Sequence, residues 1–292
     1  MKRRQFLAAG AATAAVLSQP KWLLALDADN AYRKNIGIQL YTLRNEIGRD
    51  VAGTLKAVAD AGYKQVEPYG FPNADEMIRE AKANGMAVNS SHIDSDGILK
   101  PDQKGVQPFE KILDKANDLG LTHVVVPWLA PDLRDSLDKY KMIADRCNVA
   151  AEKAKRAGIQ LAYHNHSFEF KPLEGGKTGY DVFIDQFSDA MKFEIDVFWV
   201  AVAGVDSAEL IGKLSGRVTQ LHLKDLDRSV KPPQYDSIPQ EAFKELGNGV
   251  IDMEPILAAA EKAGVSHCHV EQDHSPHPIE SIQQSAAFLR SL

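Results

Sequence analysis

The sequence predicts an α/β protein in which eight β-strands alternate with eight helices. Short apolar runs such as Val124-Val125-Val126 are typical of parallel strands that are covered by helices. Amphipathic stretches separate these runs, and glycines such as Gly85 and Gly264 end the stretches just before the next run begins. A strand followed by a helix, eight times over, closes most economically as a (β/α)8 TIM barrel.

The predicted strands follow one another at intervals that leave room for a helix. They cover Ile36–Tyr41, Gln65–Tyr69, Ala87–His92, His123–Leu129, Gln160–His166, Lys192–Phe198, Val218–Lys224 and His267–Gln272. The helices are predicted over Val51–Ala61, Asp75–Ala83, Phe109–Leu119, Leu137–Ala157, Tyr180–Phe187, Ser207–Leu214, Pro255–Ala263 and Ile279–Leu289. Asp227–Val250 is the longest irregular stretch, and we expect it to overhang the functional site as a loop.

An open, doubly wound sheet is the alternative arrangement of the same elements. Such a sheet normally carries a glycine-rich phosphate loop after its first strand. The segment Gly37–Leu43 contains no such loop, so the barrel is favoured. No linker, charge block or low-complexity segment divides the chain, which predicts one barrel domain over residues 29–292.

The first 28 residues differ in kind from the rest of the chain. Lys2, Arg3 and Arg4 precede the apolar run Phe6–Leu17, which is the pattern of an export signal. The paired arginines resemble the twin-arginine signal, which delivers folded proteins across the bacterial inner membrane. The run is shorter than the ~20 apolar residues of a membrane anchor. We therefore expect residues 1–28 to be cleaved, leaving a periplasmic protein without membrane contact.

Composition excludes some classes of partner. Hydrophobic residues make up 44% of the chain and charged residues 25%, the balance of a globular protein with a large core. The net charge of −6 provides no basic field for a phosphate backbone, so nucleic acid is a poor partner. Cys147 and Cys268 are interpreted as small buried residues. The sequence does not decide between a monomer and a homo-oligomer.

Ionisable side chains end most of the predicted strands, where a barrel of this kind builds its site. Because buried unpaired charge is costly, so many ionisable groups require a compensating partner. Four successive strands end with His164, Asp196, His222 and Glu271, whose imidazoles and carboxylates suit Mn, Co, Zn or Mg. Side chains alternate along a strand, so His164 and His166 share a face and either could be the ligand. The sequence thus predicts a divalent metal site.

These motifs resemble the xylose-isomerase-like barrel superfamily of sugar phosphate isomerases and epimerases, over essentially all of the chain after the signal. The resemblance rests on Gly37–Tyr41, Val66–Pro68, Tyr163–His166, Glu169–Phe170, Ile195–Asp196, Leu221–Asp225, Gly247–Gly249 with Asp252, and Val270–Asp273. It implies a small carbohydrate substrate and a metal held by a glutamate, an aspartate, a histidine and a glutamate. Asp196, His222 and Glu271 fill three of those places. His164 stands where ketose epimerases have glutamate, and Trp199 where they have a substrate-contacting histidine.

The resemblance implies proton transfer next to the carbonyl of a keto-sugar or glycoside, by isomerisation or epimerisation. In the family both glutamate ligands act as acid and base, and one is replaced here. Glu271 remains a candidate base, and its partner is His164, His166, Glu169 or Lys224. Export and the lack of a phosphate-binding loop favour a non-phosphorylated substrate.

Further strand-end residues are candidates for substrate contact. They are Gln39, Glu67, His92, Trp128 and Trp199. Glu67 either binds substrate or pairs with a buried cation such as Lys224, and His92 either contacts a sugar hydroxyl or satisfies a core carbonyl. The two tryptophans either stack against a sugar face or close the top of the barrel.

Rival functions remain open at the level of sequence. A lyase or hydratase on 3-keto-glycosides would use the same enolate chemistry, and His164 in place of glutamate favours it. A non-catalytic periplasmic carbohydrate-binding barrel would retain the binding cavity but would not convert its ligand. An abasic-site nuclease would need more metal-binding histidines and a basic groove, which the net charge does not support.

Overall fold

A computed structural model describes residues 30–292 and confirms the predicted TIM barrel. The predicted signal, residues 1–28, lies outside the described residues. Eight parallel strands form the central sheet: β1 (Gly37–Gln39), β2 (Gln65–Glu67), β3 (Ser90–His92), β4 (His123–Val126), β5 (Gln160–His164), β6 (Met191–Asp196), β7 (Val218–Leu223) and β10 (His267–Val270). Neighbours pair in the order β2-β1-β10-β7-β6-β5-β4-β3, and a bridge between Gln65 and Ala87 brings β2 beside β3, so the barrel is nearly closed.

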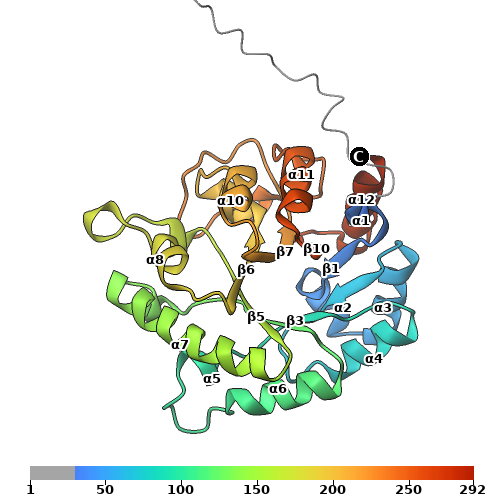
Figure 1. Ribbon diagram of the computed structural model, residues 1–292. Coiled ribbons are helices and arrows are strands. Elements are labelled where there is room, and N and C mark those ends of the chain that lie inside the picture. Colours follow the sequence, from blue (N-terminus) through green and yellow to red (C-terminus); the bar gives the residue numbers. More distant parts are fainter. Residues whose placement is uncertain (1–29) are drawn as a thin grey trace, which may run out of the picture.

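Helices surround this barrel (Figure 1). The eight predicted ones are present within a few residues: α3 (Val51–Asp60), α4 (Asp75–Ala83), α6 (Phe109–Asp118), α7 (Leu137–Arg156), α8 (Gly179–Gln186), α10 (Ser207–Lys213), α11 (Met253–Ala263) and α12 (Pro278–Ser291). Four short helices were not predicted: α1 (Ala31–Lys34), α2 (Arg44–Ile47), α5 (Asp96–Leu99) and α9 (Val197–Val202). None of the helices within residues 30–292 has the length and apolar character needed to cross a membrane.

Helix α9 corrects the prediction that the sixth strand runs to Phe198. The strand ends at Asp196, whose Oδ1 accepts hydrogen bonds from the backbone N–H groups of Phe198 at 2.9 Å and Trp199 at 3.1 Å. A carboxylate in this position starts a helix by satisfying its first free donors. The apolar residues after Asp196 therefore form a helix and do not extend the strand, because the hydrogen bonds from the Asp196 carboxylate stabilise the first turn of that helix.

The segment after β7 contains more structure than the predicted loop. β8 (Asp225–Leu226) and β9 (Phe243–Lys244) pair antiparallel. The Asp225 carboxylate then accepts hydrogen bonds from the N–H groups of Gly247, Gly249 and Ile251, at 2.9–3.0 Å. A side chain at Gly249 would clash with this carboxylate, so glycine is required there. Both ends of the segment are thereby fixed to the end of β7.

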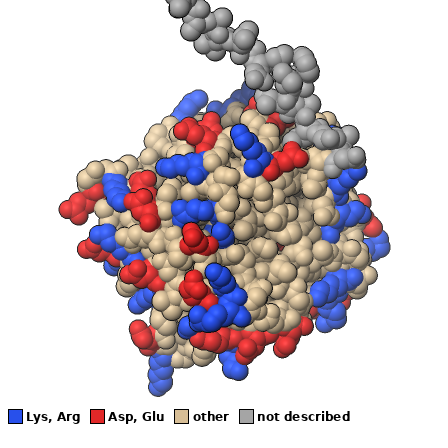
Figure 2. Space-filling model, in the orientation of Figure 1, with Lys and Arg blue, Asp and Glu red and all other residues tan. Residues whose placement is uncertain are grey.

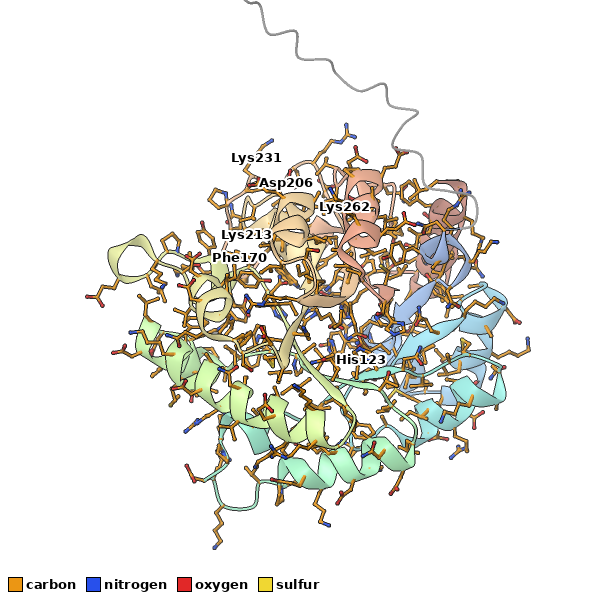
Figure 3. The ribbon with its side chains drawn as sticks, in the orientation of Figure 1. His123, Phe170, Asp206, Lys213, Lys231 and Lys262 are labelled. Atoms are coloured by element: carbon orange, nitrogen blue, oxygen red, sulfur yellow. The ribbon has the colours of Figure 1, made fainter. Side chains whose placement is uncertain are left out.

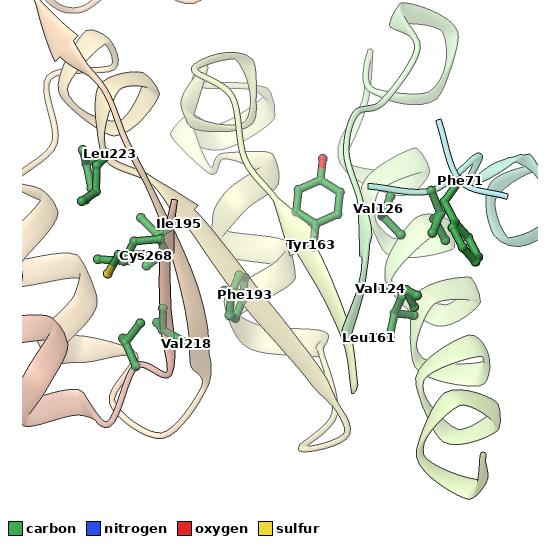
Figure 4. Close-up of a cluster of buried hydrophobic side chains, with 14 of the residues drawn as sticks. Phe71, Val124, Val126, Leu161, Tyr163, Phe193, Ile195, Val218, Leu223 and Cys268 are labelled. Carbon is green, nitrogen blue, oxygen red and sulfur yellow. The ribbon is translucent and has the colours of Figure 1, made fainter. Parts of the chain in front are cut away.

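The hydrophobic core lies between the strands and the helices. Val124, Leu161 and Phe193 on the outward faces of the strands belong to this layer (Figure 4). Beyond it, the helices expose charged side chains such as Lys213 of α10 and Lys262 of α11 (Figure 3). Acidic and basic residues are interspersed on the face shown in Figure 2.

The interior of the barrel, in contrast, is largely polar. Residues that point inward include Gln39, Glu67, Ser90, Glu194 and Gln220, all fully buried. The strand register places Gln39 beside Glu67 and Glu194 beside Gln220. A barrel interior is usually filled with branched apolar side chains, so these polar residues are unusual and must satisfy one another.

Gly37 is a test of how tightly this interior is packed. A Cβ at Gly37 would lie 2.7 Å from the backbone oxygen of Cys268 in β10. We expect Gly37→Ala to lower the free energy of unfolding by about 1–3 kcal/mol in urea denaturation, because a neighbouring backbone cannot move away cheaply. Gly212→Ala in α10 is the control: its methyl would meet no atom within 4 Å, and alanine should leave stability unchanged or raise it slightly. Wild-type stability of Gly37→Ala would contradict this packing.

Candidate metal and substrate site

Four ionisable side chains from four neighbouring strands meet at the carboxyl end of the barrel. They are His164 at the end of β5, Asp196 at the end of β6, His222 in β7 and Glu271 just after β10. The register pairs Asp196 with His222, which puts their side chains next to each other on the inner face. One potential ligand atom from each residue lies within 4.8 Å of those of the other three, and all four residues are buried. The residues that the sequence placed at strand ends therefore do converge.

Asp196 links the cluster to the fold. Its Oδ1 starts helix α9, whereas its Oδ2 forms an ion pair with Lys224 at 3.0 Å. Oδ2 lies 3.8 Å from His164 Nε2. On the other side of the cluster, His222 Nδ1 lies 2.9 Å from Glu271 Oε2. One oxygen of Asp196 is thus held by the backbone while the other faces the cluster.

Lys224 supplies positive charge to the same place. Its Nζ lies 2.7 Å from Glu271 Oε2, 3.0 Å from Asp196 Oδ2 and 3.1 Å from Asp273 Oδ2. Burial acts to lower the pKa of Lys224, but Asp196, Asp273 and Glu271 outweigh it and hold that pKa well above its usual value. Lys224 is therefore an ammonium ion that compensates three carboxylates.

The donor set fits a divalent cation. Burial, with the positive charge of His222 and His92 nearby, holds the pKa of His164 well below its usual value, so its imidazole is neutral, the form that binds a metal. Burial acts to lower the pKa of His222, but Glu194, Glu271 and Glu67 outweigh it and hold that pKa well above its usual value, so His222 must release a proton to bind a metal. Two imidazoles and two carboxylates form a ligand set suited to transition-metal ions. Of the two histidines that strand alternation left open, His164 belongs to this group and His166 does not, which favours His164 as the candidate ligand.

Below this cluster lies a buried network of hydrogen bonds inside the barrel. Glu67 Oε2 lies 2.7 Å from His222 Nε2 and accepts a hydrogen bond from Gln39 at 3.0 Å. Glu194 Oε1 lies 2.7 Å from His92 Nε2, and its Oε2 accepts a hydrogen bond from Gln220 at 2.9 Å. Glu67 thus pairs with buried His222 rather than with Lys224, which is taken by other carboxylates.

The pKa values of the two buried glutamates of this network are shifted in opposite directions. Burial and the negative charge of Glu67 raise the pKa of Glu194 to about 7, against the opposing effect of His222 and His92. Burial also acts to raise the pKa of Glu67, but His269, His92 and His222 outweigh it and hold that pKa well below its usual value. Sequence reasoning did not assign Glu194 a role, although strand alternation places it two residues before Asp196 on the same face.

Two deeper groups of residues could also hold an ion. One consists of His92, His164, Glu194 and His222, and the other of Glu67, Glu194, His222 and His269. Both share His222 with the upper cluster. Glu67, Glu194 and His269 do not line the cavity above, whereas His164 and Glu271 do. His92 and His164 of the first deeper group also line the cavity, so two of the three groups reach it, and the upper cluster is the one that matches the strand ends predicted from the sequence.

A cavity of about 500 Å³ opens over the upper cluster. It is lined by Tyr41, Tyr69, Gly70, His92, Ile93, Asp94, Pro127, Trp128, His164, His166, Lys224, Glu271 and Asp273. The predicted substrate residues His92 and Trp128 lie in this wall, while Gln39 and Glu67 are fully buried beneath it. Trp199 instead lines a neighbouring cavity. The volume is within the range of about 300–1,000 Å³ that small-molecule sites occupy.

Asp273 is a site residue that sequence reasoning did not single out. It lines the cavity and pairs with Lys224. Burial raises the pKa of Asp273 to about 6, with Glu271 adding to this effect and Lys224 opposing it. A carboxyl group with this pKa can hold or release a proton near neutral pH. Its position two residues after Glu271 was the available signal.

Glu169 lies away from the cavity. One of its oxygens accepts a hydrogen bond from the Tyr163 hydroxyl at 2.6 Å, and the other accepts one from the backbone N–H of His166 at 2.8 Å. It is fully buried. Glu169 thus fixes the backbone at His166 rather than facing a substrate.

The fold and the site together define an α/β barrel enzyme with its site at the carboxyl ends of the strands. The chain belongs to the xylose isomerase-like TIM barrel family, whose model matches residues 55–292. This confirms the family resemblance found in the sequence, and the family contains dehydratases, epimerases and isomerases.

Known relatives agree with this assignment at low identity. The inosose dehydratase of Clostridium perfringens strain 13 is 22% identical over 263 residues, covering 81% of this chain and 88% of that protein. A sugar phosphate isomerase/epimerase from Parabacteroides distasonis superposes with a TM-score of 0.71 at 24% identity, over 91% of this chain and 96% of that one. The 3-keto-D-glucoside 4-epimerase of E. coli gives a TM-score of 0.66 at 17% identity, over 88% and 99%. The IolI protein, solved with a bound zinc atom, superposes with a TM-score of 0.65 at 15% identity, over 87% of this chain and 96% of that one.

Removal of a cluster ligand should remove the metal without unfolding the protein. Asp196→Asn keeps an oxygen to accept the hydrogen bonds that start α9 but weakens the cation site. We expect it to lower metal affinity by more than the about 10–100-fold that an outer-shell residue contributes. Mass-spectrometric analysis after dialysis measures the metal content of the protein. His123→Gln serves as the control, because His123 begins β4 and therefore lies at the end of the barrel away from the site. Full metal content in Asp196→Asn would refute the ligand assignment.

The raised pKa of buried Glu169 should make the stability of the protein depend on pH. Burial raises the pKa of Glu169 to about 8, against the lowering effect of the hydrogen bond from Tyr163. Because this folded-state pKa is above the ordinary value of 4.5, the stabilising contribution is fully present below pH 4.5 and is lost as pH rises through about 8. Glu169→Gln mimics the protonated form. We expect urea denaturation to show a smaller fall in unfolding free energy between pH 5 and 9 than in wild type, by on the order of a few kcal/mol. Identical pH profiles would contradict this.

Proposed function

We propose that this protein is a divalent-metal-dependent sugar enzyme that moves a proton next to the carbonyl of a non-phosphorylated keto-sugar or glycoside. The observation that carries the proposal is the convergence of His164, Asp196, His222 and Glu271 beneath a cavity of about 500 Å³. The family membership and the names of its relatives, which act on inosose, sugars and a 3-keto-glucoside, support a small carbohydrate substrate.

His164, Asp196, His222 and Glu271 would hold the cation. A bound divalent cation supplies a Lewis acid that polarises a sugar carbonyl and stabilises the negative charge left when a neighbouring carbon loses its proton. Nothing in the donor set selects among Mn, Co, Zn and Mg. The zinc reported for the IolI protein supports a metal of this kind.

Residues in the cavity wall, the proposed ligand Glu271 among them, handle the proton. Glu271 and Asp273 are carboxylates on one side of the cavity, and Lys224 lies between them. His166 lines the cavity too, and burial together with the charge of Lys224 holds the pKa of its imidazole well below the usual value. An imidazole with so low a pKa is a weak proton acceptor, whereas the carboxyl group of Asp273, with a pKa of about 6, can accept and return a proton near neutral pH. Isomerisation or epimerisation needs two such groups.

A second candidate is a lyase or hydratase acting on 3-keto-glycosides. His164 in place of the glutamate found in ketose epimerases removes one of the two carboxylates that the epimerase reaction uses. Asp273 could instead donate its proton to a departing hydroxyl or aglycone oxygen. The curated relatives named inosose dehydratase support this outcome. Both candidates begin with the same loss of a proton next to the carbonyl.

The proposal includes export to the periplasm. It rests on the twin-arginine pattern within residues 1–28, and it is the reason for proposing a substrate without a phosphate group. A carbohydrate-binding protein without catalysis remains the contrasting outcome of the experiment below.

Deuterium exchange separates these functions. Metal-loaded protein is incubated with a 3-keto-glucoside in deuterated water, and products are followed by NMR. Deuterium at the carbon next to the carbonyl with the aglycone retained indicates isomerisation or epimerisation, whereas loss of the aglycone or of water indicates a lyase. Glu271→Gln should slow exchange by about 10²–10⁴-fold, the usual contribution of a general base, and His123→Gln should not. Binding without any exchange would refute the enzymatic proposal.

A further inference from the structure

A second cavity, of about 490 Å³, adjoins the cavity over the metal cluster. Trp128 and His166 line both cavities. Trp128 is 44% exposed, an unusually large fraction for a tryptophan, and so presents an open ring at the place where the cavities meet. The two cavities therefore form adjacent compartments, each within the size range of small-molecule sites.

The walls of the second cavity suit a ring-shaped ligand. Phe168, Trp199 and Tyr235 join Trp128 in lining it. Aromatic side chains of this kind bury a ligand ring against their faces, and tryptophan and tyrosine add a polar group at the edge. The indole Nε1 of Trp199 and Nδ1 of His166 both lack a hydrogen-bond partner among the residues described. The cavity thus combines flat apolar walls with unused polar atoms.

Arg134 adds hydrogen-bond donors to this cavity. Its guanidinium lies 3.4 Å from the ring centre of Phe168 and 5.4 Å from that of Trp128. Its Nη1 makes no hydrogen bond in the described part of the chain. A guanidinium carries only donors, so an oxygen-rich ligand would satisfy it. The geometry therefore favours a ring that bears oxygen atoms over a plain hydrocarbon ring.

A third cavity, of about 750 Å³, also adjoins the site through Asp273. Its lining, which includes Arg44, Arg49 and Glu241, contains no phenylalanine, tyrosine or tryptophan. It offers charge without a stacking surface. The second cavity is for this reason the better place for a sugar ring.

We propose that the substrate is a two-ring glycoside, such as a keto-disaccharide. Its keto ring occupies the cavity over the metal cluster, and its second sugar ring occupies the second cavity, against Trp128 and with oxygens facing Arg134. The proposal rests on the proposed function for the identity of the reacting ring. It adds the substrate class and a subsite formed by Trp128, Arg134, Phe168, Trp199 and Tyr235.

Calorimetric titration tests the subsite independently of turnover. The metal-loaded protein is titrated with two probes, the methyl glycoside of 3-keto-glucose and 3-keto-cellobiose. We expect the disaccharide to bind at least tenfold more tightly than the methyl glycoside. Arg134→Met and Tyr235→Ala should each reduce this ratio severalfold while leaving the affinity for the methyl glycoside within about twofold. Circular dichroism checks that both variants are folded.

Arg49→Met is the matched control, since it removes a guanidinium from the third cavity. It should leave the ratio unchanged. Equal affinity of wild type for the two probes, a ratio retained in both subsite variants, or a ratio lost only in Arg49→Met would overturn the proposal, as would failure of both probes to bind. Tight binding of the disaccharide without deuterium exchange would instead refute the proposed function and leave the subsite standing.

Discussion

The compensation of buried charge inside the barrel is the constraint on which the rest of the structure depends. Glu67, Glu194, Asp196 and Glu271 are removed from water, and uncompensated carboxylates there would be incompatible with a stable fold. Lys224 and the buried histidines balance them through contacts of about 3 Å. Glu67 stands on β2, Glu194 and Asp196 on β6, and Glu271 just after β10, so the pattern of charges holds only when these strands keep their register. The functional groups and the barrel closure therefore specify each other.

This arrangement divides the molecule into two kinds of interior. The layer between strands and helices is apolar and supplies the stability of the fold. The space inside the barrel is polar and contains two levels of carboxylates. Asp196 and Glu271 lie at the carboxyl ends of the strands, and Glu67 and Glu194 lie deeper in the barrel. The lower groups hold His222 and His92 in place by hydrogen bonds, and outer partners of this kind orient metal ligands in other proteins. The stable layer lets the inner space be used for chemistry.

Much of the fold and part of the site could be predicted from the sequence. Apolar runs, helix-ending glycines and polar strand ends were enough to place the eight strands and the converging residues His164, Asp196, His222 and Glu271. Other features depended on information that is not local. The single-turn helices carry too few residues to show a period, and Asp196 reads as a strand end until its hydrogen bonds to the following backbone are seen. The pairing of Glu67 with His222, and the role of Glu169 as a backbone anchor, depend on which strands become neighbours.

The attachment of residues 245–251 to Asp225 has an evolutionary consequence. Asp225 directly follows Lys224, and its carboxylate holds the returning chain at Gly247, Gly249 and Ile251. The intervening stretch, which carries Tyr235, begins and ends at this one anchor. Insertions and substitutions in that stretch can therefore reshape the wall of the second cavity without shifting β7. The wall of the second cavity at Tyr235 can thus change by mutation while Lys224 and the end of β7 stay in place.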